Sequence, residues 1–178
     1  MIGQHTPSPP AAPSDVLLSA GHADVDDGAH VHFDVAGDGP PLVLLAGQAN
    51  SRHWWDPIRG DFAAAFRTVA MDTRGTGRSS VGDRAEYSTR RFAADVVAVL
   101  DEIGIGRAHV YGTSMGGKIA QWLAIDHPDR VAGLVLGCTT AGGPHAQVAT
   151  ADVLETLTWP ADTARSALAE LMFTPDWL

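Results

Sequence analysis

The spacing of apolar residues along the chain changes near Pro41. Over residues 16–35, an apolar stretch is followed by Asp26-Asp27-Gly28, a strong turn signal, and then by Val31, Phe33 and Val35 in alternation with polar residues, which predicts a β-hairpin. After Pro41 the apolar residues come in short continuous runs, which favour strands buried on both faces of a parallel sheet. These runs cover residues 42–46, 68–71, 109–111 and 131–136.

The segments between these runs predict three helices, over residues 54–66, over residues 92–103, and from about residue 117 to a point before Pro128. In the second of them, five apolar side chains recur at helical spacing, Ser88 and Thr89 are available as caps, and Gly104 is a stop signal. Strands that alternate with helices predict an α/β fold, with a mostly parallel sheet flanked by helices and joined by right-handed crossovers.

The two ends of the chain lack this alternation. Residues 1–14 are rich in Pro, Ala and Ser and predict a flexible tail, which leaves residues 15–144 as the core domain. Residues 145–178 contain one or two predicted helices, interrupted at Pro160, and no further predicted strand. The length of 178 residues suits a single domain with a sizeable core.

The composition is that of a globular protein, with 45% apolar and 19% charged residues. Lys and Arg number 12, Asp and Glu number 21, and the net charge of −9 argues against a nucleic-acid partner. No apolar run approaches the ~18 residues of a membrane span, and the N-terminal sequence resembles no secretory signal. We therefore expect a cytoplasmic protein that does not bind membranes. The single cysteine, Cys138, excludes an internal disulfide and a thiolate-rich metal site.

One motif carries recognisable chemistry. Residues 112–116 read Gly-Thr-Ser-Met-Gly, a G-x-S-x-G pattern between a predicted strand and a predicted helix. In such a tight turn the serine hydroxyl stands clear of the sheet, and the flanking glycines relieve crowding of the backbone. The N-terminus of the following helix directs free N–H groups toward a reacting carbonyl. Ser114 is therefore the candidate nucleophile.

Two other readings of glycine-rich segments agree less well with the sequence. Residues 112–118 also fit G-x-x-x-x-G-K, a phosphate-binding loop, but Ile119 stands where Ser or Thr would bind Mg²⁺. Gly75-Thr76-Gly77 follows a predicted strand, yet no helix begins at the right place and the third glycine of a dinucleotide-binding motif is missing. We interpret residues 75–77 as a shaped loop at the carboxyl edge of the sheet.

Three segments together resemble the α/β-hydrolase fold family: LVLLAGQANSRHWW, VAMDTRGTGRSS and HVYGTSMGGKIAQWLAIDHPDRVAGLVLGC. The resemblance covers about residues 16–144 and is nearest to the branch of 3-oxoadipate enol-lactonases and small esterases. It implies that Ser114 is the nucleophile and that the backbone N–H groups of Met115 and Gln48 form the oxyanion hole. It also implies a serine hydrolase that needs no metal and no organic cofactor.

Two details refine this resemblance. Residues 46–47 are Ala-Gly where many relatives have His-Gly, and the enol-lactonase-like branch often lacks that histidine. The nucleophile position holds Ser114, whereas haloalkane dehalogenases have Asp there. Both details favour the branch that hydrolyses carboxylic esters and enol-lactones.

We expect the family's catalytic acid and histidine to lie beyond this chain. Family members have eight strands and place these residues after later strands, whereas this sequence predicts six strands and then the start of a helical cap at residues 145–178. His53 and His145 could approach the mouth of the site, but neither lies where the family places its base, and we interpret both as surface or loop histidines. Asp72 is expected to anchor the following loop, and Asp95 to lie on a helix.

These observations favour a serine hydrolase that transfers the acyl group of a small ester or enol-lactone from Ser114 to water. The chain would be the N-terminal portion of such an enzyme, truncated after the sixth strand and the start of the cap. The alternative is an incomplete fragment that is inactive alone or serves only for binding or assembly. Since residues 131–136 would then form an unpaired apolar edge, we expect self-association or association with a complementing C-terminal segment.

Overall fold

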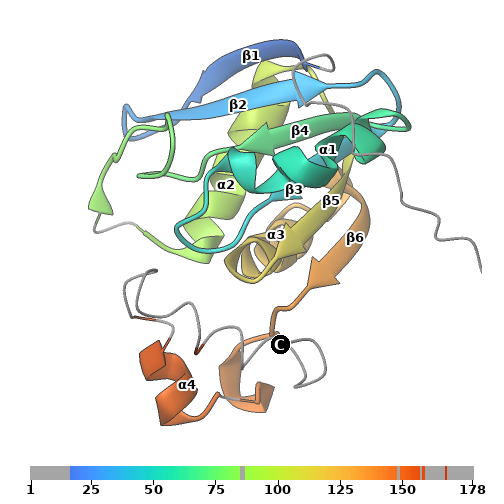
Figure 1. Cartoon of the computed structure of the whole chain (residues 1–178). Coiled ribbons are helices and arrows are strands. Elements are labelled where there is room, and N and C mark those ends of the chain that lie inside the picture. Colours follow the sequence, from blue (N-terminus) through green and yellow to red (C-terminus); the bar gives the residue numbers. More distant parts are fainter. Residues whose placement is uncertain (1–16, 85–86, 148, 157, 159–166, 168–178) are drawn as a thin grey trace, which may run out of the picture. The chain divides into compact units, whose positions relative to one another are not determined.

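The computed structural model describes residues 17–84, 87–147, 149–156, 158 and 167 (Figure 1). The predicted N-terminal tail, residues 1–14, lies outside the described residues, as does most of the helical part predicted over residues 145–178. The chain forms two compact units, one up to Ala141 and the other from Gly142 onward. The described elements of the second unit are a short 3₁₀ turn, Gly143–His145, and the helix α4, Ala151–Thr156.

Within the described residues, a six-stranded sheet forms the centre of the first unit. Its strands are β1 Leu17–Asp24, β2 His30–Ala36, β3 Pro41–Leu45, β4 Arg67–Met71, β5 Ala108–Thr113 and β6 Val131–Gly137. Their order is β1-β2-β4-β3-β5-β6, and β3–β4, β3–β5 and β5–β6 are parallel pairs. The pairs β1–β2 and β2–β4 are antiparallel. This arrangement confirms the predicted α/β class with an N-terminal hairpin.

Helices cover both faces of this sheet (Figure 1). They are α1 Asp56–Ala63, α2 Thr89–Glu102 and α3 Met115–Asp126. On the face of α1, Trp55 packs in one buried cluster with Leu42 and Leu44 of β3. On the face of α2 and α3, Val43 and Leu45 join a larger cluster. Successive residues of β3 therefore enter opposite cores, as the geometry of a strand requires.

The ends of α2 follow the signals in the sequence. The Ser88 hydroxyl accepts a hydrogen bond from the Arg91 amide at 3.0 Å and caps the helix. Gly104, with a φ of +68°, follows the last turn and ends the helix. The helix predicted over residues 54–66 is shorter, because a 3₁₀ turn at Arg52–Trp55 precedes α1. None of the helices that the structure describes is long and apolar enough to span a bilayer.

A buried cluster of charged residues joins β2, α1 and the end of β4. Arg52 donates from Nε to Asp34 Oδ2 at 2.6 Å and from Nη1 to Asp72 Oδ2 at 2.9 Å. Arg59 of α1 pairs with the other Asp34 oxygen and donates to the Asp34 carbonyl at 2.9 Å. All four residues are buried, so each charge depends on its partners for stabilisation.

Asp72 also organises the loop that follows β4. Its buried carboxylate accepts hydrogen bonds from the backbone amides of Arg52 at 2.7 Å and Arg78 at 2.9 Å. Gly77 has a φ of +50°, and a Cβ there would overlap this carboxylate. The Ser79 hydroxyl closes the loop by donating to the Asp72 carbonyl at 2.7 Å. The predicted anchoring of the loop by Asp72 is confirmed.

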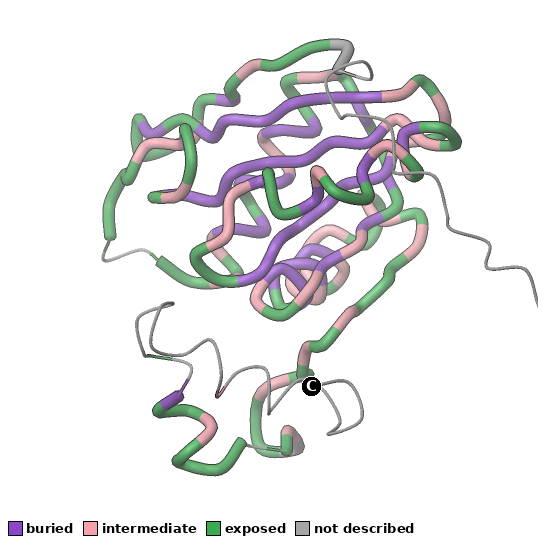
Figure 2. The backbone as a smooth tube through the Cα atoms, viewed as in Figure 1, coloured by how far each residue is buried: buried purple, intermediate pink, exposed green. Residues whose placement is uncertain are grey.

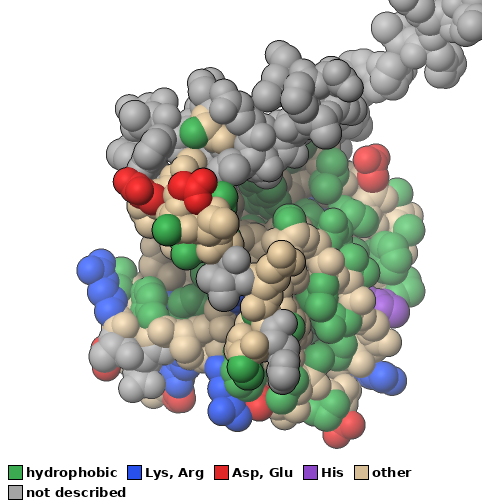
Figure 3. Space-filling model, turned by 90° about the horizontal axis from the view of Figure 1, so that it is seen from below, with side chains coloured by type: hydrophobic (Ala, Val, Ile, Leu, Met, Phe, Trp, Pro, Cys, Tyr) green, Lys and Arg blue, Asp and Glu red, His purple; other side chains and the backbone are tan. Residues whose placement is uncertain are grey.

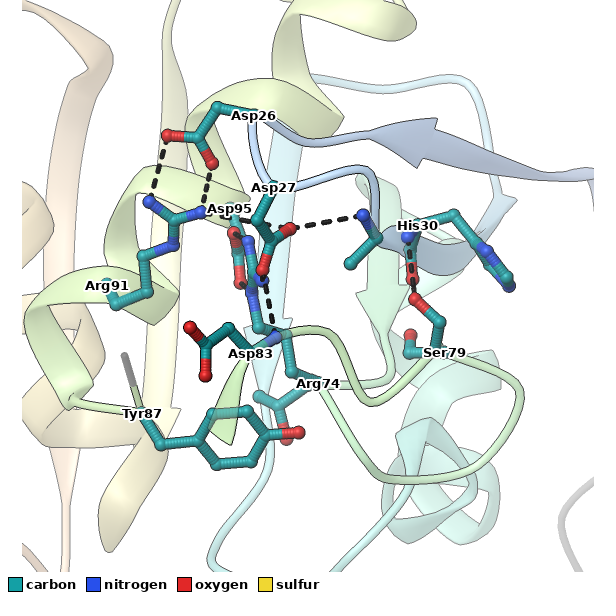
Figure 4. A network of polar contacts seen from close by, with 12 residues as sticks. Asp26, Asp27, His30, Arg74, Ser79, Asp83, Tyr87, Arg91 and Asp95 are labelled. Atoms are coloured by element: carbon teal, nitrogen blue, oxygen red, sulfur yellow. Dashed lines mark hydrogen bonds and ion pairs between the residues drawn. The ribbon is translucent and has the colours of Figure 1, made fainter. Parts of the chain in front are cut away.

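A second network of ion pairs ties the same loop to the hairpin and to α2 (Figure 4). Arg74 donates to both carboxylate oxygens of Asp95, at 2.6 and 2.8 Å, and pairs with Asp27 in the hairpin turn. The Asp83 amide donates to Asp27 at 3.1 Å, and this bond is the main cause that lowers the pKa of Asp27 to about 2. Hydrogen bonds to Asp95 raise the pKa of Arg74. As predicted, Asp95 lies on a helix, α2, and it pairs with Arg74 of the loop after β4.

Strand β6 forms one edge of the sheet. Its residues Leu134, Val135 and Leu136 are 38%, 54% and 44% exposed. The prediction that residues 131–136 are buried on both faces is therefore wrong (Figure 2). The reason is the position of the strand, since an edge strand has a neighbouring strand on one side only. Figure 3, viewed from below, shows many hydrophobic side chains at the surface on this side of the sheet.

The buried cluster predicts a large loss of stability when one of its charges is removed. Asp72→Asn should lower the free energy of unfolding by about 3–5 kcal/mol, because the buried Arg52 guanidinium loses a charged partner. The control is Asp126→Asn, since Asp126 pairs with an exposed arginine, Arg90, and solvent-exposed pairs of this kind contribute little to stability. Urea unfolding followed by circular dichroism measures both changes. Equal losses in the two variants would contradict the role given to Asp72.

Candidate active site

Ser114 lies in the turn between β5 and α3, where the G-x-S-x-G pattern places it. Its φ of +53° and ψ of −116° lie in a region of backbone space that few residues other than glycine adopt. The residue is exposed. The predicted strand–turn–helix geometry is confirmed, and backbone strain of this kind persists only where the surrounding structure enforces it.

Close contacts between backbone segments explain the two glycines of the motif. A Cβ on Gly112 would overlap the Gly116 carbonyl, and a Cβ on Gly116 would overlap the carbonyl oxygens of Leu45 and Ala46. The first turn of α3 therefore lies directly against the carboxyl end of β3. A side chain at either position would push the helix away from the sheet and shift Ser114.

The loop after β3 passes beside Ser114. A Cβ on Gly47 would lie 3.4 Å from the Ser114 Cβ and 3.9 Å from its Oγ. The next residue, Gln48, is exposed, and Ala49 has a φ of +60°. The backbone amide of Asn50 donates to the Gly47 carbonyl at 3.3 Å and closes this turn. The structure thus brings the segment that contains Gln48 close to the candidate nucleophile.

The start of α3 presents backbone donors at the same place. The Ser114 carbonyl accepts hydrogen bonds from the amides of Gly117 at 3.0 Å and Lys118 at 3.3 Å. Among the described residues, the amides of Met115 and Gln48 find no acceptor. Unpaired N–H groups and the positive end of a helix dipole attract negative charge. Such donors are suited to an oxyanion that forms beside Ser114.

Residues that follow β6 hold the backbone of Ser114 from another side. The Ser114 amide donates to the Gly137 carbonyl at 2.9 Å, and the Thr139 hydroxyl donates to the Ser114 carbonyl at 2.8 Å. Cys138, between these two residues, has a φ of +42°. Sequence reasoning missed these contacts, because Thr139 lies 25 residues from Ser114 and belongs to no recognised motif.

No histidine side chain that the structure describes forms a hydrogen bond with Ser114. His53 is exposed, and its Nδ1 lies 2.7 Å from Asp56 Oδ2 at the start of α1. His127 follows the last turn of α3, and His145 belongs to the second unit. The described side chains therefore supply no hydrogen-bonded base for Ser114.

The described residues include no group of three His, Cys, Asp or Glu side chains that could hold a metal ion. A cavity of about 240 Å³ lies between the hairpin turn and α2, with Val25, Asp26, Arg91 and Ala98 in its lining. Ser114 does not line it, and Asp26 is already paired with Arg91. This cavity is therefore separate from the candidate active site.

The mostly parallel sheet, the strained serine between β5 and α3, and the glycine of α3 packed against the end of β3 define an α/β-hydrolase architecture. A family model described as alpha/beta hydrolase fold matches residues 40–178. The chain belongs to this family.

Three similar proteins illustrate the range of reactions in the family. The protein named "Putative carbamate hydrolase RutD" of Variovorax paradoxus (strain S110) is 40% identical over 109 residues, 60% of this chain and 41% of the relative. A fluoroacetate dehalogenase of a Burkholderia species is 38% identical over 106 residues, 57% of this chain and 35% of the relative. The solved structure of Est816, described as an N-acyl homoserine lactone degrading enzyme, has a TM-score of 0.66 at 30% identity and matches 84% of this chain and 56% of that chain.

The matches cover only part of each relative. The chain spans about 40% of the length of the first curated relatives that it matches. The activity, substrates and partners of a whole enzyme are therefore proposed below and are not taken from these relatives.

The contact between α3 and β3 predicts intolerance to a methyl group at residue 116. Gly116→Ala should destabilise the fold by about 1–3 kcal/mol, because its Cβ overlaps backbone oxygens that cannot easily move, although Ala is the better helix former. Gly106→Ala is the matched control, since a Cβ there meets no atom within 4 Å. Urea unfolding compares the two variants. If both unfold like the unmodified chain, the close approach of α3 to β3 is refuted.

Proposed function

We propose that Ser114 is the nucleophile of a serine hydrolase that transfers the acyl group of a carboxylic ester or an enol-lactone to water. The observation that carries this proposal is an exposed serine at positive φ, with unpaired backbone N–H groups beside it. A hydroxyl in this position can meet a substrate carbonyl without obstruction from the sheet. Membership of the α/β-hydrolase fold family supports hydrolysis as the class of reaction.

The proposed reaction has two steps. Ser114 Oγ forms a bond to the carbonyl carbon while a base takes its proton, and the amides of Met115 and Gln48 donate to the resulting oxyanion. The bond to the alcohol or enol oxygen then breaks, and the leaving group takes the proton. Water attacks the acyl-serine ester with the help of the same base, which releases the carboxylic acid and restores the serine hydroxyl. Neither step requires a metal ion or an organic cofactor.

The chemistry of the nucleophile favours a carbonyl substrate. An ester, a lactone and a carbamate all present a carbonyl carbon with an attached heteroatom, which a serine hydroxyl attacks to form an acyl-enzyme. The names of the carbamate hydrolase and of the lactone-degrading enzyme are consistent with such a substrate. The similar dehalogenase is named for a different reaction, the removal of a halide. In the family, haloalkane dehalogenases have an aspartate nucleophile, so Ser114 argues against halide removal by this chain.

We propose that the base and its supporting acid are not among the residues that the structure describes. The curated relatives that the chain matches are more than twice as long as the matched part, so segments beyond the match are available for these two residues. A chain without them is the incomplete fragment that forms the alternative hypothesis, with a role in binding or assembly. The single cysteine is consistent with the cytoplasmic location that we propose for either form.

A fluorophosphonate probe tests the nucleophile directly. The intact chain should be labelled at Ser114, although slowly, because no described base is hydrogen-bonded to the hydroxyl. Ser114→Ala should abolish the adduct that mass spectrometry detects on the peptide containing this residue. Ser51→Ala, in the nearby loop after β3, is the control and should leave labelling unchanged, since Ser51 forms no side-chain cap hydrogen bond. Labelling at a different serine would remove the assignment.

Hydrolysis of p-nitrophenyl acetate separates a complete enzyme from an incomplete one. Without a base, the chain should accelerate hydrolysis by no more than about 10³–10⁴-fold over water. Turnover of about 1–10³ s⁻¹ that disappears in Ser114→Ala would instead show that a base lies within these 178 residues. The absence of both turnover and labelling would favour the binding or assembly role.

We further infer that β6 pairs with another strand, from a second copy of the chain or from a complementing C-terminal segment. Its outer edge lacks a strand partner among the described residues, and its apolar side chains are exposed. Backbone N–H and C=O groups on such an edge are a template for strand pairing. The apolar character of the strand adds a hydrophobic contribution to the same association.

Light scattering tests this association. The isolated chain should have a mass above the 18.7 kDa of one copy, and Val135→Lys should shift it toward the monomer, because a charge on an edge strand opposes pairing. The control is Ile125→Lys, since Ile125 is a 65% exposed apolar residue on α3 and should not affect the mass. A monodisperse monomer that unfolds cooperatively would contradict the inference.

A further inference from the structure

The segment of residues 137–140, which follows β6, is bound along the first turns of α3. The Gly137 carbonyl accepts from the Ser114 amide at 2.9 Å, and the Thr139 hydroxyl donates to the Ser114 carbonyl at 2.8 Å. Gln121 of α3 donates from Nε2 to the Thr140 carbonyl at 3.1 Å. Both polar backbone groups of Ser114 thus have partners in one short segment that is distant in sequence.

The side chain of Thr139 is fixed by contacts on two sides. Its hydroxyl donates to the Ser114 carbonyl, which also accepts the backbone amides of Gly117 at 3.0 Å and Lys118 at 3.3 Å, and the Thr139 bond is the shortest of the three. Its methyl group fills the space beside Gly117, where a Cβ would lie only 2.6 Å from the Thr139 Cγ2. Gly117 stands outside the G-x-S-x-G pattern, and the position of Thr139 accounts for its lack of a side chain.

The backbone around Thr139 is also in an uncommon conformation. Cys138 has a φ of +42°, a value that residues with a side chain rarely adopt. This turn directs the chain from the Gly137 carbonyl, which binds one side of the Ser114 backbone, to the Thr139 hydroxyl, which binds the other. Ser114, itself at positive φ, is therefore hydrogen-bonded to the two residues that flank Cys138.

We propose that Thr139 is a positioning residue for Ser114: its hydroxyl holds the Ser114 carbonyl and so keeps the serine side chain aimed at the substrate carbonyl. This inference rests on the proposed role of Ser114 as the nucleophile. Thr139 does not touch the reacting atoms. It acts through the backbone of Ser114, whose strained φ would otherwise allow the residue to relax away from the reactive orientation.

Loss of the Thr139 hydroxyl should lower the rate at which Ser114 reacts and should leave the affinity for a probe nearly unchanged. A nucleophile that is displaced by a fraction of an ångström reacts more slowly, while contacts made by the rest of the ligand are retained. Removal of one hydrogen bond from a neutral hydroxyl should slow the reaction about fivefold. The global fold should change little, because the core clusters do not include this residue.

The test measures labelling of Ser114 in the intact chain as a function of fluorophosphonate concentration. Thr139→Val removes the hydroxyl and keeps the shape of the side chain, whereas Thr139→Ser keeps the hydroxyl and removes the methyl group. We expect a saturating labelling rate about fivefold lower in Thr139→Val, with an unchanged half-saturating concentration, and a rate in Thr139→Ser close to that of the unmodified chain. Thr140→Val is the matched control, since the Thr140 side chain is exposed and only its carbonyl is bonded.

The possible outcomes are distinguishable. Equal labelling rates in the unmodified chain and Thr139→Val, or a Thr139→Ser rate as low as that of Thr139→Val, would overturn the positioning role while leaving the proposed function intact. Absence of labelling at Ser114 in the unmodified chain would overturn both. If Thr139→Val fails to unfold cooperatively, Thr139→Ser and Thr139→Ala make the same comparison, because both lack the methyl group and only the first keeps the hydroxyl.

Discussion

Direct contact between the backbone of α3 and the end of β3 constrains the rest of the site. The contact exists because residue 116 has no side chain, and it places the preceding Ser114 in a strained conformation between strand and helix. It also accompanies the close approach of the loop at Gly47, where an added Cβ would lie 3.4 Å from the Ser114 Cβ. The nucleophile candidate, the N-terminus of the helix and the loop after β3 are therefore positioned by one packing arrangement.

Buried ion pairs fix the positions of the loops around the contact between α3 and β3. The carboxylate of Asp72 binds both the backbone amide and the guanidinium of Arg52, and so joins the loop after β4 to the segment after β3. Arg74 links the same loop to α2 through Asp95. Polar groups at such depth are favourable only when their partners are in place, which makes the carboxyl edge of the sheet sensitive to the loss of a single charge.

The elements that could be predicted from the sequence are those that depend on near neighbours. Alternation and the turn residues identify the hairpin, Ser88 and Gly104 mark the ends of α2, and the glycine spacing locates Ser114 at the turn. The cluster of Asp34 with two arginines could not be predicted, because its partners lie 18 and 25 residues away and charged residues usually indicate exposure.

Other features depend on the arrangement of whole strands. The apolar residues of β6 have the composition of an interior strand, and their place at an edge was expected from the strand number of the family, not from any local pattern. The contact of Thr139 with Ser114 likewise arises because β5 and β6 are neighbours, a relation that no local pattern encodes. The candidate nucleophile was therefore accessible to sequence reasoning, whereas much of what holds it was not.

In the proposed reaction, Ser114 attacks a carbonyl whose oxygen then binds the backbone amides of Met115 and Gln48. A crystal structure of the chain after reaction with a fluorophosphonate tests it most directly, because the phosphoryl oxygen of the adduct occupies the place of the oxyanion. We expect a covalent bond to Ser114 Oγ, with the phosphoryl oxygen about 2.7–3.2 Å from both amide nitrogens. An adduct on another residue, or a phosphoryl oxygen that points into solvent away from both amides, would contradict it.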